Sequence, residues 1–474
     1  MVRGAHYLGL VVLLGGCASV GPDYHVPRAA MINAPGAAQP FLSGTLATKA
    51  EPLPDHWWKL YDNPALDALI EKALETNTDL RVAEANLQRA LALLDARGSS
   101  REIQGSLNAE TSYAQRSGEA ELQHVQPPVR QIYNAGVSVS YDLDLFGRLK
   151  RGIEAASADM EAAVAARDLA RVNVAAETAR AYADVCNGGY QIDVLMRSIA
   201  LQEKGIQITG VLVRNGRAAP YELDRRGAAL AGNRARLPRL AAGRRNAVFR
   251  IAALQGKVPS QADMGLLDCR RPLELAQVMP VGDGQALLKR RPDIRMAERR
   301  LAASTARIGV ETAALYPDIR LGASAGSTGA VADILSPLTN RFGFGPLIGW
   351  TLNRHAARAR IAAAQAQGSA DLVAFDGAVV KALREVEAAL NSYDAGLQQQ
   401  RELDEAREEA ERVARRITQL RRGGKIAELP AVEAERDLVI AEQAAAEGRA
   451  AVNNDQITLF LALGGGWKAS TIGE

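Results

Sequence analysis

Apolar and polar residues alternate one by one in short segments of both halves of the chain. The clearest segment carries apolar side chains at every second position and polar ones between them: Val137, Val139, Tyr141, Leu143 and Leu145 against Ser138, Ser140, Asp142 and Asp144. Alternation over ~10 residues is typical of a barrel strand with one face toward lipid and the other toward water. Four such strands are predicted, at about 103–117, 132–146, 317–329 and 341–353.

A very long helical pattern follows each pair of predicted strands. Residues 148–213 and 356–422 contain no proline and are rich in Ala, Glu, Arg and Leu. At ~1.5 Å per residue, ~65 helical residues make a rod of roughly 100 Å, which is too long for a compact domain. Each rod ends in a glycine turn and is followed by a predicted return helix, at about 220–256 and 428–463.

The two halves repeat one another. Asp79–Leu87 (DLRVAEANL) reads again as Asp293–Leu301 (DIRMAERRL), and the order of helix, two strands, long helix, glycine turn and return helix is the same in both halves. The predicted organisation is a signal peptide (1–16), a lipidated N-terminal arm (17–62), repeat 1 (63–256), a proline-containing linker (257–285), repeat 2 (286–464) and a C-terminal tail (465–474).

Composition supports long helices and gives no sign of catalysis. Only 5% of the 474 residues are aromatic although 47% are hydrophobic, and the net charge of +3 is too balanced to indicate a nucleic-acid partner. The sequence has no HExxH or CxxC spacing, no phosphate loop and no nucleophile–base set, so neither an enzyme nor a cofactor is expected. Cys186 and Cys269 leave two alternatives open, a disulfide or two free thiols.

The first seventeen residues predict export and a lipid anchor. Arg3 and His6 precede a short apolar run, Leu8–Leu14, and two glycines lead into Cys17. This run is too short to span a bilayer, and its layout is that of a secretory signal peptide. The end of the run, Leu14–Cys17 (LGGC), resembles the bacterial lipobox, which implies that the cysteine is acylated after cleavage. Ala18 in place of an aspartate favours the outer membrane.

Four motifs in this order resemble one family of proteins. They are Gly21–Tyr24 (GPDY) with Pro27, Asp144–Arg148 (DLFGR), Arg291–Ile294 (RPDI) and Ala462–Trp467 (ALGGGW). Together they resemble the TolC-like outer-membrane efflux proteins, in the lipidated branch that serves resistance-nodulation-division pumps. The resemblance implies a mainly α fold with a β-barrel portion. In it, three chains each give four strands to a twelve-stranded barrel, which continues as a long periplasmic α-helical tunnel.

The chain departs from the family pattern at two strands. Ile103 stands where a proline usually precedes the first strand, whereas Pro317 is present in the second half. The fourth strand closes with Trp350–His355 and has no Phe-Gly-Arg. The boundary of that strand is therefore left open.

The resemblance also implies a gate at the periplasmic tip. Leu429 and Glu433 match a constriction-lining leucine and acid, and four residues apart on a helix places both on one face. Glu222 is taken as the acidic counterpart in the first half. Basic residues cluster near both tips: Arg214, Arg217, Arg225, Arg421, Arg422 and Lys425. Three roles stay open for them: pairing with the gate acids, docking a periplasmic adaptor, or a solvated basic surface.

The expected function is a passive exit duct in the outer membrane. A homotrimer would receive drugs or other small toxic compounds from a periplasmic adaptor and an inner-membrane resistance-nodulation-division pump. One alternative is the exit duct of a type I secretion system. Another is a lipid-anchored periplasmic coiled-coil scaffold without a pore, which the matching strands and the lack of a sustained heptad disfavour.

Overall fold

The computed structural model describes residues 19–43, 48–49, 51, 53–119, 124–334 and 336–465, so Cys17 lies outside the described part. The chain forms two compact units, and each takes segments from both halves of the sequence. The sheet unit comprises residues up to Pro27, Leu87–Ala163 and Ala297–Phe375; the hairpin unit comprises Arg28–Asn86, Val164–Met296 and the residues from Asp376 onward. The units therefore cut across the two sequence repeats, because strands of both repeats pair in one sheet.

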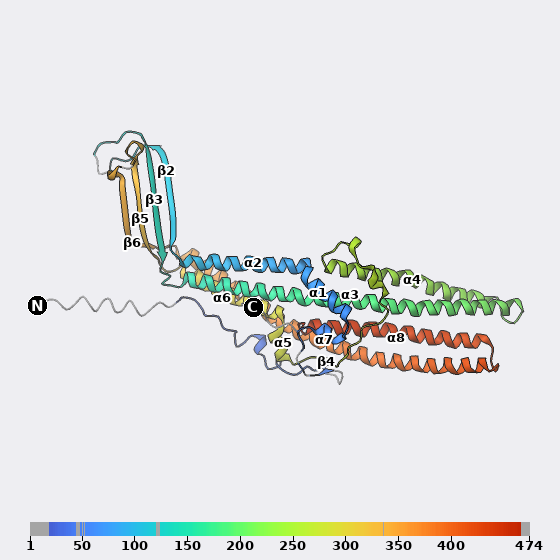
Figure 1. The fold of residues 1–474 in the computed structure, drawn as a ribbon. Coiled ribbons are helices and arrows are strands. Elements are labelled where there is room, and N and C mark those ends of the chain that lie inside the picture. The colour runs from blue at the N-terminus through green and yellow to red at the C-terminus, as the bar shows by residue number, and fades with distance from the viewer. Residues whose placement is uncertain are drawn as a thin grey trace. The chain divides into compact units, whose positions relative to one another are not determined.

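The sheet unit contains one antiparallel four-stranded sheet in the order β2-β3-β5-β6 (Figure 1). Its strands are β2 (Gln104–Ala114), β3 (Arg130–Asp142), β5 (Asp318–Ala330) and β6 (Asn340–Gly349). Strand β3 ends four residues before the expected position and β6 ends at Gly349 rather than near 353. The chain turns after β3 because Asp144 and Gly147 adopt positive φ angles of 44° and 76°.

The register of this sheet sorts side chains onto two faces. Leu107, Val137, Ala325 and Phe342 lie side by side across the four strands, and the next row along the strands is Ser106, Ser138, Ser324 and Gly343. Since successive side chains of a strand point to opposite faces, one face is apolar and the other is small and polar. The apolar face is uncovered: Phe342 is 94% exposed and Leu107 is 76% exposed.

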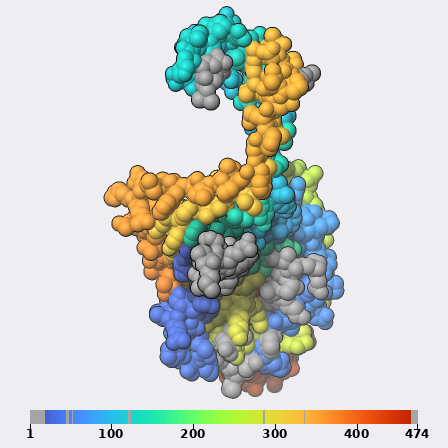
Figure 2. Space-filling model, turned by 90° about the vertical axis from the view of Figure 1, so that its left-hand side faces the viewer, coloured from blue at the N-terminus to red at the C-terminus, as the bar shows by residue number. Residues whose placement is uncertain are grey.

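Two loops meet at one end of the sheet. Figure 2 shows the loop after β2 (teal) next to the loop after β5 (orange). Arg116 donates a hydrogen bond to Thr328 Oγ1 (3.4 Å), and Tyr133, Ser327 and Thr339 share hydroxyl hydrogen bonds. A loop residue of each hairpin therefore bonds to a strand of the other hairpin, in addition to the pairing of β3 with β5.

Long helices make up most of the rest of the chain. They are α1 (Pro64–Thr76), α2 (Thr78–Gly98), α3 (Arg148–Arg214), α4 (Tyr221–Leu254), α5 (Gly284–Arg290), α6 (Pro292–Ala313), α7 (Arg354–Arg422) and α8 (Glu428–Ala462). In Figure 1, α4 runs back along α3 and α8 runs back along α7. No helix in the described ranges is both long enough and apolar enough to cross a membrane.

The core of the hairpin unit combines small helical residues with aromatic side chains of the N-terminal arm. Trp57 and Trp58 are fully buried, and the Trp57 ring stacks on Phe460 of α8 with centroids 4.4 Å apart. Ala179 and Ala183 of α3 belong to the same core, which brings the helix backbones close together. The arm also adds a short strand, β1 (Thr48–Lys49), parallel to β4 (Met279–Pro280).

The segment 257–285, expected to be a linker, is tied to α3. Cys186 of α3 and Cys269 form a disulfide with sulfur atoms 2.06 Å apart, which decides between the two alternatives left open by the sequence. Buried Arg244 donates hydrogen bonds to the backbone oxygens of Val185 (2.9 Å) and Cys269 (2.5 Å). A side chain at Gly189 would overlap both Cys269 O and the Arg244 guanidinium, so glycine is required there.

Removing this disulfide is expected to destabilise the hairpin unit. It closes a loop across 83 residues of sequence, and disulfides of this kind contribute typically about 2–4 kcal/mol. The double variant Cys186→Ala/Cys269→Ala should therefore show a lower Tm by differential scanning fluorimetry. Reductant should lower the Tm of the wild type and leave the double variant unchanged. Equal Tm values for the two proteins without reductant would contradict this assignment.

Candidate functional site

The turn between α3 and α4 and the turn between α7 and α8 have the same backbone conformation. Gly216 (φ 67°) donates to Val213 O (3.0 Å), and the next amide donates to Leu212 O (2.8 Å). Gly424 (φ 70°) donates to Arg421 O (2.9 Å), and the amide after it donates to Leu420 O (2.9 Å). Both are Schellman turns, in which glycine takes the left-handed conformation that other residues adopt only at a cost.

The turn glycines give one reference point from which positions at the two tips can be compared. Glu433 lies nine residues after Gly424, and the residue nine positions after Gly216 is Arg225. Counted in this way, Glu222 stands at the position of Pro430, and its role as the acidic counterpart of Glu433 stays a prediction.

Glu433 of α8 is joined to α4. Arg226 Nη2 donates to Glu433 Oε1 at 2.6 Å, and the Arg226 side chain is only 15% exposed. Leu429 precedes Glu433 by one helical turn and is half-buried. The predicted gate leucine and gate acid thus lie together on α8, and the acid is neutralised by an arginine that the sequence did not single out.

A second carboxylate at the tip is more strongly paired. Both oxygens of Glu428 accept from Arg421 (2.8 Å each), and Lys204 Nζ lies 2.7 Å from Oε1. Hydrogen bonds from Lys204 and Arg421 lower the pKa of the Glu428 carboxyl. Glu428 begins α8 and so also faces the positive end of the helix dipole. Its place at the start of the return helix was the signal available in the sequence.

Opposite charges continue along the same hairpins. Glu442 of α8 pairs with Arg197 of α3 (2.8 Å), and Glu447 of α8 pairs with Arg236 of α4 (2.8 Å). Partly exposed pairs of this kind contribute about 0–1 kcal/mol each. Together they place the acids of α8 against the bases of the α3–α4 hairpin, from the tip toward the core.

The six predicted basic residues divide into two groups. Arg421 is bound to Glu428, and Arg225 is bound to Glu222 at 2.5 Å within one helical turn. The other four are exposed and have no salt-bridge partner among the described residues: Arg214, Arg217, Arg422 and Lys425. They occupy equivalent positions, the last helical residue and the residue after the turn glycine, at both tips.

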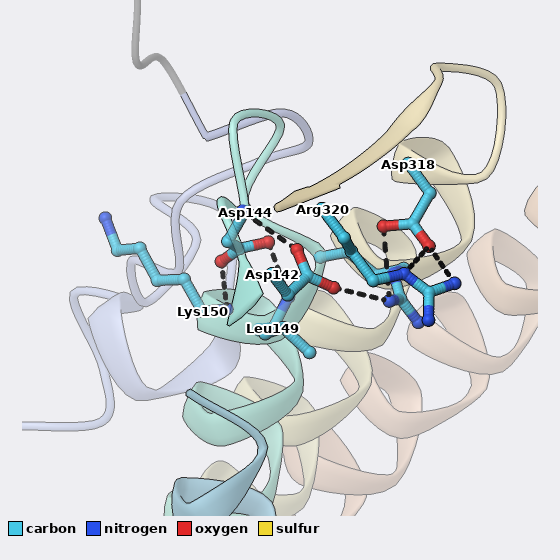
Figure 3. A network of polar contacts seen from close by, with 7 residues as sticks. Asp142, Asp144, Leu149, Lys150, Asp318 and Arg320 are labelled. Carbon is cyan, nitrogen blue, oxygen red and sulfur yellow. Dashed lines mark hydrogen bonds and ion pairs between the residues drawn. The ribbon is translucent and has the colours of Figure 1, made fainter. Parts of the chain in front are cut away.

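A second polar network fixes the junction between β3 and α3. Asp144 accepts hydrogen bonds from the amides of Leu149 and Lys150, both at 2.8 Å (Figure 3). Arg148 pairs with Asp142 (3.1 Å), while Arg320 pairs with Asp318 (2.8 Å). The DLFGR motif is thus a capping turn at the start of α3.

The fold and the repeated tips match one known family. Residues 69–257 and 284–465 match the family model described as outer membrane efflux protein. The chain belongs to the outer membrane efflux protein family. It is 28% identical to a probable efflux pump outer membrane protein, TtgC of Pseudomonas putida, over 97% of this chain and 94% of that protein.

Two further comparisons agree with this family membership. The chain is 26% identical to SilC of Salmonella typhimurium, a probable outer membrane lipoprotein, over 97% of this chain and 98% of that protein. Its structure matches that of the outer-membrane channel OprN with a TM-score of 0.84 and 32% identity, covering 95% of this chain and all of that one. The predicted fold class and outer-membrane location are therefore confirmed.

The described residues of this outer membrane efflux protein show no cluster that would suggest bound metal. Over the described ranges, no group of three or more His, Cys, Asp or Glu side chains is arranged to hold an ion. Several predicted features lie outside these ranges: the signal peptide (1–16), Cys17, Ala18 and the Gly466–Trp467 end of the last motif.

Proposed function

We propose that this outer membrane efflux protein is the exit duct of a tripartite efflux system. It carries drugs or other small toxic compounds from a periplasmic adaptor and an inner-membrane resistance-nodulation-division pump to the exterior. The pump supplies the energy, and the duct itself performs no catalysis. The relatives support this reading because they are efflux proteins and outer-membrane channels rather than enzymes.

The observation that carries the proposal is the open sheet. Strands β2 and β6 each pair with only one neighbour, and the sheet presents an uncovered apolar face beside a polar one. In lipid an open sheet edge leaves backbone groups without partners, so β2 and β6 require strands of other copies. Three copies would close a barrel of twelve strands, with the small polar residues lining the lumen.

The competing functions fit less well. A periplasmic scaffold without a pore has no use for a sheet whose apolar face is exposed along four strands. A type I secretion duct would share the barrel, but TtgC and SilC are described as an efflux pump protein and an outer membrane lipoprotein. Acylation of Cys17 belongs to the proposal as a second anchor beside the barrel.

Conductance tests the duct directly. The purified protein should form trimers by native mass analysis and open ion-conducting channels in planar bilayers. The closed tip is expected to keep the wild-type conductance low, and Leu429→Ala/Glu433→Ala should raise it. If neither the wild type nor the double variant conducts, the exit-duct function is contradicted and the periplasmic scaffold without a pore is favoured.

The free basic residues at the tips support adaptor docking. Arg214, Arg217, Arg422 and Lys425 would present twelve positive charges in a trimer, and complementary charge accelerates and orients protein association. Arg217→Glu/Lys425→Glu should weaken binding of the adaptor at least about tenfold, measured by surface plasmon resonance at low salt. Arg239→Glu/Arg245→Glu, which reverses two exposed charges farther along α4, is the control. Equal affinity in both double variants would favour a solvated basic surface.

A further inference from the structure

The first described residues of the chain are held by an arginine of α3. The Arg151 side chain is only 4% exposed. Its Nε donates to Val20 O (3.2 Å), and its Nη2 donates to Gly21 O (3.2 Å) and to Asp23 Oδ1 (2.7 Å). A single buried guanidinium therefore donates to three acceptor atoms within four residues of the N-terminal arm. Its remaining amino group donates to Glu154 of its own helix at 2.8 Å.

The same segment fits closely against α6. Gly21 has φ 88°, and a side chain on it would overlap the backbone of Gly309. Tyr24 donates a hydrogen bond to Glu298 (2.7 Å), and the Arg299 guanidinium lies 5.6 Å from the Tyr24 ring centroid. The GPDY motif is thus a docking segment with specific contacts on two helices.

This docking segment lies at the end of the sheet where β3 ends and β5 begins, called here the foot of the sheet. Val20 N–H donates to Phe146 O at 3.1 Å, in the loop that follows β3. The Phe146 ring stacks on Tyr316 with centroids 4.7 Å apart, and Trp350 donates its indole N–H to Leu315 O. Tyr316 and Trp350 are about half exposed. Aromatic side chains with one polar end are enriched where a barrel meets the membrane–water interface.

We propose that Arg151 is a positioning residue for the acylated amino terminus. It holds residues 19–24 so that the acyl group on Cys17 enters the membrane beside these aromatic residues, in the leaflet that the foot of the sheet contacts. The proposal rests on the proposed outer-membrane duct and on acylation of Cys17. Two residues of extended chain span at most about 7 Å, so the acyl group must start close to Ser19.

In this proposal Arg151 is a clamp on the N-terminal arm, so that the acyl group and the sheet together anchor the protein in the membrane. An acyl chain on a loose arm would hold the protein at the membrane without placing the sheet there. When the arm is docked, insertion of the acyl chain brings the foot of the sheet to the same leaflet, which raises the effective concentration of the strands at lipid.

A double-mutant cycle separates this role from simple stabilisation. Four chains are expressed with a functional signal peptide: wild type, Arg151→Ala, Cys17→Ser and the double variant. The urea-resistant trimer in outer-membrane fractions is then measured. Arg151→Ala should lower its yield about tenfold in the acylated chain and change it little in the Cys17→Ser chain, because only the acylated chain uses the clamp for delivery.

Lys150→Ala is the matched control, since this side chain lies one residue away and pairs with Glu154, and no hydrogen bond joins it to the described residues of the arm. Its yield should equal that of the wild type. The same factor of loss for Arg151→Ala in both backgrounds would mean that Arg151 only stabilises the fold, and would overturn the proposal. A wild-type protein absent from the outer membrane would instead refute the proposed duct, so the two failures are distinguishable.

Hydrogen exchange gives a second, independent readout. The peptide containing residues 19–24 should be protected in both the wild type and the Cys17→Ser chain, and should lose protection in Arg151→Ala. Arg151→Lys should not restore it, because an ammonium cannot reproduce the planar fork that reaches three acceptors. Loss of protection in Cys17→Ser alone would show that the lipid, and not Arg151, holds the arm, and would overturn the proposal.

Discussion

Replacing Arg291 by alanine should lower the free energy of unfolding of the hairpin unit by about 3–5 kcal/mol, as expected when one partner of a buried ion pair is removed. The Arg291 side chain is 8% exposed. It donates to both oxygens of Asp293 (2.9 and 2.6 Å), to Glu385 (2.8 Å) and to Ala462 O (2.8 Å). It therefore joins the start of α6, the middle of α7 and the end of α8.

The stability cost of Arg291→Ala should depend on pH, in a direction that follows from the pKa of Asp293. Burial alone would raise the pKa of Asp293, but hydrogen bonds from Arg291 outweigh it and lower that pKa below its usual value. A lowered folded-state pKa contributes stability above the unfolded pKa near 4, and that stability is lost as the pH falls through the folded value. In Arg291→Ala the burial is opposed only by backbone hydrogen bonds, such as the one from Ile294 N–H, so the pKa of Asp293 is higher than in the wild type. The stability gap to wild type should therefore narrow as the pH falls from 7 toward about 4.

Thermal melts of the detergent-solubilised protein between pH 4 and 8 measure both effects. Arg384→Ala is the matched control, because Arg384 is 68% exposed and approaches the same Glu385 only at 3.8 Å. Its effect should stay within about 0.5 kcal/mol. If Arg291→Ala destabilised the protein no more than Arg384→Ala, or if its stability gap to wild type widened in acid, Arg291 would not be the residue that holds α6, α7 and α8 together.

Replacing Arg226 by alanine should open the tip. The Arg226–Glu433 pair is partly exposed and is expected to contribute about 0.2–1 kcal/mol per copy. Its loss in three copies shifts the closed-to-open equilibrium by roughly three- to 150-fold. Single-channel recording should show a matching rise in the time spent open.

A charge swap tests whether the pair itself keeps the tip closed. Arg226→Glu/Glu433→Arg should restore the low conductance, whereas either single reversal should raise it. Glu447→Ala breaks the equivalent α4–α8 pair farther from the tip and should leave conductance unchanged. An open channel in the swapped variant would show that these two residues act separately.

Periodic features of this protein were predictable because each depends on a few neighbouring residues. The alternation around Val137 and Ser138 predicted a two-faced strand, and the register of the sheet confirms those faces. Proline-free stretches predicted α3 and α7, and the glycines after them predicted the turns at Gly216 and Gly424. The family motifs were also readable, since each is a short continuous run.

Contacts between distant segments were not predictable in this way. Arg226 and Glu433 are 207 positions apart, and nothing local in either return helix indicates that they pair. Glu222 and Glu433 both follow a tip turn, but they lie six and nine residues after the turn glycines Gly216 and Gly424, which the backbone geometry identifies. Likewise the cysteine spacing left pairing open until α3 and the segment around Cys269 were placed side by side.

The sequence by itself determined the elements of this protein, their tandem order and the family to which they point. Those properties depend on side-chain periodicity, turn chemistry and short motifs, all of which are local. The tertiary structure alone decided which carboxylate meets which arginine, that Arg151 and Arg291 are buried, and that the linker is bound to α3. Such pairings depend on how rods of roughly 100 Å align. A shift of one helical turn along these rods would exchange every partner while leaving the periodicity of the sequence unchanged.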